Sequence, residues 1–67
     1  MQRISLAAAR VSKGWTQAEM AKKMGVSRQT IFDWESGKRT MKPSYIYMFC
    51  GLTGFDEHEL ILPKKSI

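Results

Sequence analysis

The chain has 67 residues, enough for one small domain and near the lower limit for a fold without disulfides or metal. Its 11 Lys and Arg against 6 Asp and Glu give a formal charge of +5 and a pI near 9.7, which favours an anionic partner such as nucleic acid or a lipid surface. The one cysteine, Cys50, excludes an intrachain disulfide and, with His58 as its only companion, a thiolate metal site. We expect a cytoplasmic protein, because we find neither a membrane-spanning apolar run nor a secretory signal.

Capping residues predict the first two helices. Ser5 can accept a hydrogen bond from the free amides of a helix that runs to about residue 12 and ends at Lys13-Gly14. Thr16 and Glu19 have the spacing of a capping box, in which the hydroxyl and the carboxylate each bond a free backbone amide. A second helix is therefore expected over residues 17 to 24.

A third helix is expected over residues 28 to 36. Ser27 can cap its beginning, and Gly37 ends it. A basic loop follows, from residue 38 to residue 42, and it is a candidate clamp for a nucleic-acid backbone.

Two more helices complete the predicted domain. Pro43 suits a first helical turn, and apolar residues then recur at spacings of three and four to about residue 52. Asp56 can cap a last short helix through about Leu60, and residues 63 to 67 have the composition of a frayed tail. No strand pattern competes. The sequence thus predicts a single all-α domain over residues 1 to 67, with its core from about 4 to 62.

Residues 17 to 34 have the spacing of a helix-turn-helix. If residue 17 is the first position, the two helices of such a unit meet through the fourth, eighth, tenth, fifteenth and eighteenth positions, which are all apolar here. The fifth position must be small, and the ninth must turn the chain with a positive φ. Seven agreeing positions make the pattern far more specific than any one of them. These residues are Met20, Ala21, Met24, Gly25, Val26, Ile31 and Trp34.

Several stretches resemble the phage repressor and Cro type of helix-turn-helix family, also called the XRE family. They are Arg10, Thr16-Gln17-Ala18-Glu19, the run from residue 25 to 31, and Trp34-Glu35-Ser36-Gly37-Lys38. The resemblance implies a compact five-helix lambda-repressor-like domain that binds double-stranded operator DNA as a dimer, with the third helix in the major groove. It also implies a nucleoid-associated protein of a bacterial cell, and we expect no cofactor, metal or small-molecule ligand.

The third helix should present its base-reading side chains on the face opposite its apolar stripe. Arg28 can take guanine O6 and N7, and Gln29 can take adenine N6 and N7, each worth about 1 to 3 kcal/mol of discrimination. Phe32 is an exposed aromatic that can touch a thymine methyl or pack on a loop or a partner. Asp33 can accept from cytosine N4 or pair with Arg28 or a lysine. The predicted base-reading residues are Ser27, Arg28, Gln29, Phe32 and Asp33.

Phosphate contacts are expected on both sides of that helix. Gln17 begins the second helix, where free amides and the positive end of the helix dipole attract an anion. The basic loop is expected to contact the sugar-phosphate backbone. A merely solvated surface is the alternative for each side chain. The predicted phosphate-binding residues are Gln17, Ser36, Lys38, Arg39, Thr40 and Lys42.

Two further sets of residues have structural roles. The resemblance implies a partly buried ion pair between Arg10 and Glu35, which members of this family often form. The chain also ends in an apolar group larger than a tail needs, for which a dimer seam is the natural use and completion of the monomer core is the alternative. The predicted dimer contacts are Phe55, Leu60, Ile61 and Leu62, together with Ile67.

The sequence therefore favours a sequence-specific transcriptional regulator, a Cro-like repressor that binds a palindromic operator as a homodimer. An antitoxin or a restriction-modification controller of the same fold remains an alternative. A protein-protein adaptor with only non-specific DNA affinity is the alternative from another class. No enzyme is expected, because the sequence has no Gly-rich phosphate loop, no paired carboxylates in an apolar helix face and no nucleophile with a histidine partner.

Overall fold

The computed structural model describes residues 3 to 62. Over this range the chain forms α-helices, one short 3₁₀ helix and one pair of short strands. No helix in residues 3 to 62 has both the length and the apolar character needed to cross a bilayer. In chain order the elements are β1 Ile4–Ser5, α1 Leu6–Ser12, α2 Gln17–Met24, α3 Arg28–Ser36, α4 Pro43–Thr53, η1 Glu57–Glu59 and β2 Leu60–Ile61.

The helices begin where the capping residues predict. The Thr16 hydroxyl accepts from the Glu19 amide at 3.1 Å, and the Glu19 carboxylate accepts from the Thr16 amide at 2.9 Å. These hydrogen bonds favour the charged carboxylate and lower the pKa of Glu19. The Ser27 hydroxyl accepts from the Thr30 amide at 3.1 Å and caps α3 in the same way. Local hydrogen bonding thus fixes the starts of both helices of the helix-turn-helix.

The C-terminal part differs from the prediction. The fifth helix expected from Asp56 through Leu60 is a 3₁₀ helix of three residues, so the described chain has four α-helices and the five-helix prediction is wrong here. Leu60 leaves the turn with an extended backbone, which carries its side chain into the core. β2 then pairs in parallel with β1, with Ile4 opposite Leu60. Strands of two residues are too short to give an alternating pattern in the sequence.

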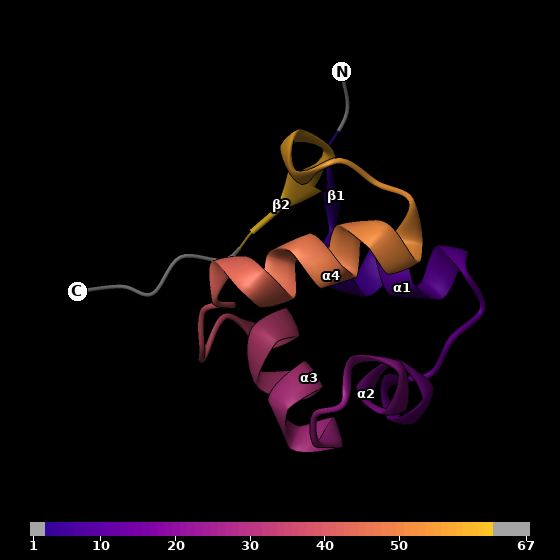
Figure 1. The fold of residues 1–67 in the computed structure, drawn as a ribbon, viewed down its shortest axis with the longest axis vertical. Coiled ribbons are helices and arrows are strands. Elements are labelled where there is room, and N and C mark those ends of the chain that lie inside the picture. The colour runs from indigo at the N-terminus through magenta and orange to yellow at the C-terminus, as the bar shows by residue number, and fades with distance from the viewer. Residues whose placement is uncertain (1–2, 63–67) are drawn as a thin grey trace.

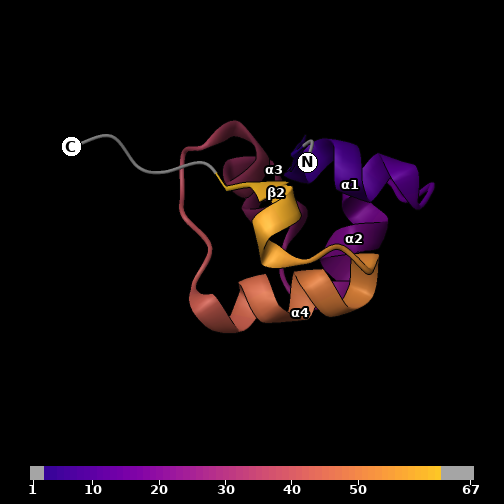
Figure 2. The ribbon, with the colours of Figure 1, turned by 90° about the horizontal axis from the view of Figure 1, so that it is seen from above.

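The elements surround one small core. Figure 1 shows α2 and α3 on one side of α4, and β1 and β2 together on the other. Figure 2 shows α1 and α4 at opposite sides of the molecule, with the yellow turn that leads into β2 between them. Each of the four α-helices and β2 contributes to the core. Its buried apolar residues are Leu6, Ala9, Met20, Ala21, Met24, Ile31, Trp34, Phe49 and Leu60.

α2 and α3 form the predicted helix-turn-helix and pack against each other more extensively than any other pair of elements. Five of the seven framework residues are buried, and Val26 packs half-buried against them. Gly25 turns the chain with a φ of +70°, in the left-handed region that favours glycine. The turn and the shared core therefore hold α3 in one orientation on α2.

Candidate nucleic-acid interface

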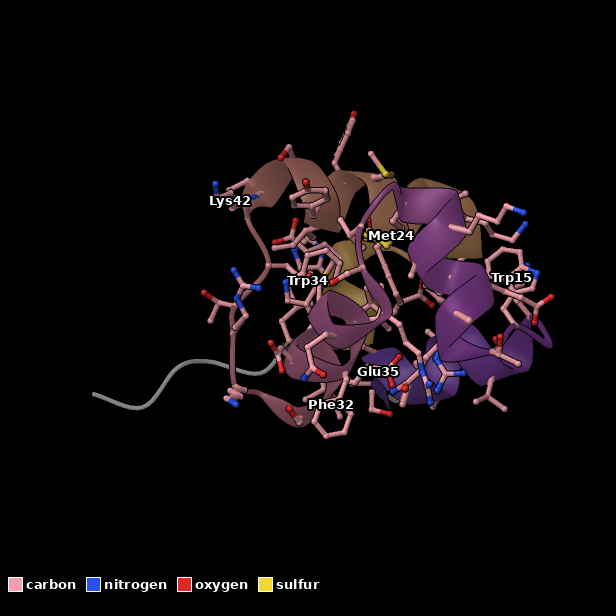
Figure 3. All side chains as sticks on the ribbon, turned by 90° about the horizontal axis from the view of Figure 1, so that it is seen from below. Trp15, Met24, Phe32, Trp34, Glu35 and Lys42 are labelled. Atoms are coloured by element: carbon pink, nitrogen blue, oxygen red, sulfur yellow. The ribbon has the colours of Figure 1, made fainter. Side chains whose placement is uncertain are left out.

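The first two turns of α3 present polar and aromatic side chains to solvent. Arg28 and Gln29 are exposed, and Phe32 is 49% exposed. Figure 3 shows Phe32 pointing away from Trp34, which lies on the opposite side of α3. Gln17 from the first turn of α2 joins these three residues in lining a surface hollow. The fold thus gathers three predicted base-reading residues and one predicted phosphate-binding residue at one place.

Ser27 directly precedes Arg28 in the sequence, and its side chain caps the beginning of α3. Besides accepting from the Thr30 amide, its hydroxyl lies 2.9 Å from the Thr30 hydroxyl. Ser27 is exposed, so a base or phosphate can still approach its oxygen.

Asp33 lies elsewhere than predicted. It was expected on the exposed face of the third helix, but it is only 7% exposed, and that placement is wrong. The backbone is held at this position, because the amides of Lys38 and Arg39 both donate to the Asp33 carbonyl oxygen, at 2.9 and 3.2 Å. The Asp33 carboxylate accepts from Gln29 Nε2 at 3.0 Å. The partner of Asp33 is therefore the neutral Gln29 amide, and within residues 3 to 62 Asp33 does not form the predicted salt bridge with Arg28 or a lysine.

Arg10 and Glu35 form an ion pair. Arg10 Nε lies 2.7 Å from Glu35 Oε2, and Arg10 Nη2 lies 3.3 Å from Glu35 Oε1. The two side chains are 12% and 9% exposed. Arg10 Nη1 also donates to the Trp15 carbonyl at 2.7 Å. The pair ties α1 to the last turn of α3.

Gln17 is joined to this ion pair, a contact that the sequence analysis missed. Its Nε2 donates to Glu35 Oε1 at 3.0 Å. The side-chain amide has a second hydrogen, and the first backbone amides of a helix have no partner within the helix. Gln17 therefore keeps donors for a phosphate while its side chain is oriented by Glu35.

The predicted phosphate-binding loop lies on the other flank of α3. Lys38, Arg39, Thr40 and Lys42 are all exposed, as is Ser36, whose hydroxyl donates to the Asp33 carbonyl at 3.3 Å. A second hollow contains three of the loop residues together with Thr30 and Tyr45, which the sequence analysis did not select. Its lining residues are Val26, Thr30, Trp34, Arg39, Thr40, Lys42 and Tyr45.

The C-terminal apolar group belongs largely to the monomer. Leu60 is buried in the core, and Phe55 and Leu62 pack half-buried against it. Ile61 is exposed, and Ile67 lies outside the described residues. Completion of the monomer core therefore accounts for Leu60, so this side chain is not available to a partner. On α4, Tyr47 and Met48 are exposed as well.

Comparison with known proteins identifies the family. A family model described as helix-turn-helix, HTH_3, matches residues 6 to 60, which is most of the chain. The chain belongs to this helix-turn-helix family. The match supports the XRE and Cro type that the sequence resembles, and it includes the helix-turn-helix formed by α2 and α3.

A solved structure resembles this helix-turn-helix protein closely in fold. The crystal structure of a hypothetical transcription factor, NHTF, from Neisseria superposes with a TM-score of 0.75 at 29% sequence identity. The match covers 87% of this chain and 65% of that chain, so the chain spans less than two thirds of the length of its structural relative. No curated protein matches the sequence.

Proposed function

We propose that this helix-turn-helix protein is a sequence-specific repressor of the Cro-like kind, which places α3 in the major groove of a palindromic operator. The observation that carries the proposal is the hollow at the start of α3, where the exposed side chains of Arg28, Gln29 and Phe32 lie beside Gln17. The major groove of B-DNA admits an α-helix, and the N-terminal residues of a recognition helix reach the base edges. Arg28 then reads guanine, and Phe32 contacts a thymine methyl.

Charge on both flanks of α3 supports this orientation. The exposed basic residues Lys38, Arg39 and Lys42 follow α3, while the free amides of α2 begin at Gln17. Both groups attract phosphates, and the two strands that border a groove present phosphates on both sides of an inserted helix. Binding therefore depends steeply on salt, because each neutralised phosphate releases counterions.

We propose a homodimer on DNA, because a palindromic operator repeats its half-site. Two recognition helices in successive major grooves lie about 34 to 36 Å apart. Among residues 3 to 62, the large apolar side chains that are exposed outside the α3 surface, and so available for a seam, are Val11, Tyr47, Met48 and Ile61. Sedimentation of the protein with and without an operator duplex tests this part of the proposal, since the complex should contain two chains for each duplex.

The decisive experiment is selection of bound duplexes from a random DNA library, followed by titration of the best site and a scrambled site over a range of salt concentrations. We expect a two-fold symmetric motif and a preference of about a thousandfold or more over scrambled DNA. Equal and steeply salt-dependent binding to both duplexes would contradict the proposal and favour an adaptor with an electrostatic DNA affinity. A promoter reporter carrying the selected site then measures repression.

A matched pair of variants locates the interface. Arg28→Ala and Lys13→Ala remove the same charge, but Arg28 lines the hollow on α3 whereas Lys13 caps the end of α1. Arg28→Ala should weaken binding to the selected site by roughly 1 to 3 kcal/mol and relax the preference at one base pair. Lys13→Ala should leave that preference unchanged. Equal effects of the two changes would mean that net charge, and not the α3 surface, governs binding.

A further inference from the structure

We propose that Asp33 determines the base preference of Gln29 without touching DNA, by fixing the Gln29 side-chain amide in the orientation that selects adenine over guanine. Asp33 is thus a positioning residue, and Gln29 is the residue that contacts the base. The inference rests on the proposed function, because it names the base that one part of the α3 surface prefers.

The chemistry of the pair fixes the orientation of the amide. Gln29 and Asp33 lie four residues apart on α3, so one helical turn brings their side chains together. Gln29 Nε2 donates to Asp33 Oδ1 at 3.0 Å. A carboxylate accepts hydrogen bonds but has no hydrogen to donate, so only the nitrogen edge of the amide can face it. The Gln29 oxygen must therefore point away from Asp33.

The two members of the pair differ in their freedom. Asp33 is buried, and the Lys38 and Arg39 amides that donate to its carbonyl hold the backbone at this point. Gln29 is exposed and lines the hollow between the start of α2 and α3. The buried Asp33 thus orients the exposed Gln29. Gln29 then presents its remaining hydrogen-bonding atoms in the hollow, where the edge of a base would enter.

The oriented amide matches one base pattern in the major groove. Asp33 uses one of the two hydrogens on Nε2, which leaves the Gln29 oxygen as an acceptor and a single N–H as a donor. Adenine offers N6–H to the oxygen and N7 to the N–H, so both remaining groups are satisfied. Guanine presents two acceptors, O6 and N7, and would need both hydrogens of the amide. Cytosine and thymine offer one bond each. The pair therefore favours adenine.

The test begins with duplexes selected by the wild-type protein and by Gln29→Ala. The base pair whose preference disappears in Gln29→Ala marks the position that Gln29 reads. At this position the wild-type protein should bind adenine about tenfold or more tightly than guanine. Asp33→Ala frees the second amide hydrogen, and the ratio of the two affinities should fall at least about fivefold, mainly because guanine binds better.

A double variant separates positioning from a general loss of structure. In the Gln29→Ala background, Asp33→Ala should no longer change the ratio, because its effect passes through Gln29. If Asp33→Ala fails to fold, as judged by circular dichroism and thermal unfolding, Asp33→Leu fills the buried site without an acceptor and should lower the ratio in the same way. A purely structural role would weaken binding to all duplexes equally.

Three outcomes overturn the inference. An unchanged adenine-to-guanine ratio in a folded Asp33 variant shows that Asp33 does not set the preference. A selected motif that Gln29→Ala leaves unaltered shows that Gln29 reads no base. In both cases a motif exists, so the proposed function stands and the inference alone fails. If the wild-type protein selects no motif, the proposed function itself fails.

Discussion

Arg10 and Glu35 are separated by 25 residues, yet their side chains meet at 2.7 Å and are almost closed to solvent. The Glu35 carboxylate also accepts from Gln17, and the Arg10 guanidinium donates to the Trp15 carbonyl. One ion pair therefore connects α1, the start of α2 and the end of α3. It fixes the relative positions of the two helices that border the hollow on α3.

Removal of one partner should be costly. Arg10→Met leaves the Glu35 carboxylate nearly buried without its cation, and we expect a loss of about 3 kcal/mol in the free energy of unfolding. Urea unfolding measures this loss. The double variant with Glu35→Leu should recover part of it, which gives a coupling energy above about 1 kcal/mol. Purely additive effects of the two substitutions would show that the ion pair contributes nothing to stability.

Two glycines form a matched pair for backbone strain. Gly25 has a φ of +70°, whereas Gly51 lies within α4, and an added Cβ meets no atom within 4 Å at either position. Gly25→Ala should destabilise the domain by about 1 to 2 kcal/mol, because an alanine disfavours the left-handed conformation. Gly51→Ala should stabilise it by up to about 1 kcal/mol, since alanine is the better helix former. Thermal unfolding decides, and equal signs for the two changes would contradict this account.

Alanine substitutions of Phe32 and Trp34 should have different effects: the first should mainly weaken DNA binding, and the second should mainly lower the stability of the fold. Phe32 is half exposed beside Arg28 and Gln29, so Phe32→Ala should change stability by about 0.5 kcal/mol or less and weaken binding to the selected operator severalfold. Trp34 is buried, with its ring 5.1 Å from that of Tyr45, and Trp34→Ala should cost about 3 to 5 kcal/mol. Calorimetry and operator titration measure the two effects. A large destabilisation by Phe32→Ala would place that side chain in the core.

Acid should destabilise the fold through two capping carboxylates. Hydrogen bonds from Thr16 lower the pKa of Glu19, and hydrogen bonds from His58 lower the pKa of Asp56. A carboxyl group with a lower pKa in the folded state adds stability that is fully present above its unfolded pKa. The unfolded values are near 4.5 and 3.8, so this stability is lost as the pH falls below them through the folded pKa.

The Glu19→Gln variant isolates one of these groups. A glutamine at this position preserves the capping box but has no titrating proton. Urea unfolding at a series of acid pH values should therefore show a shallower loss of stability than in the wild-type protein. An identical pH dependence in the two proteins would rule out Glu19 as a contributor.

The helix-turn-helix was predictable because its determinants lie close together in the sequence. Thr16 and Ser27 act on amides three residues away, and Gly25 determines its own backbone conformation. Helical periodicity alone placed Asp33 on the exposed face. The structure buries Asp33 instead, and its carboxylate accepts from Gln29 Nε2, a side-chain contact that helical periodicity does not predict.

Contacts between distant parts of the chain account for the other differences. Leu60 was expected in a helix and at a dimer seam, but it enters the monomer core beside a strand that begins at Ile4. The stretch between Asp56 and Leu60 has room for only one helical turn. The chain then becomes extended at Leu60, where it pairs with β1. The bond from Gln17 to Glu35 likewise depends on how α2 and α3 cross.

The pairing of Ile4 with Leu60 also has a consequence for the order of folding. It closes a loop that contains nearly the whole described chain, and closing a long loop costs more chain entropy than closing a short one. The contacts between α2 and α3 span a much shorter stretch, so they can form before the two ends meet. The strands should then be the last structure to assemble and the first to open. Opening at the ends would leave α3 packed against α2.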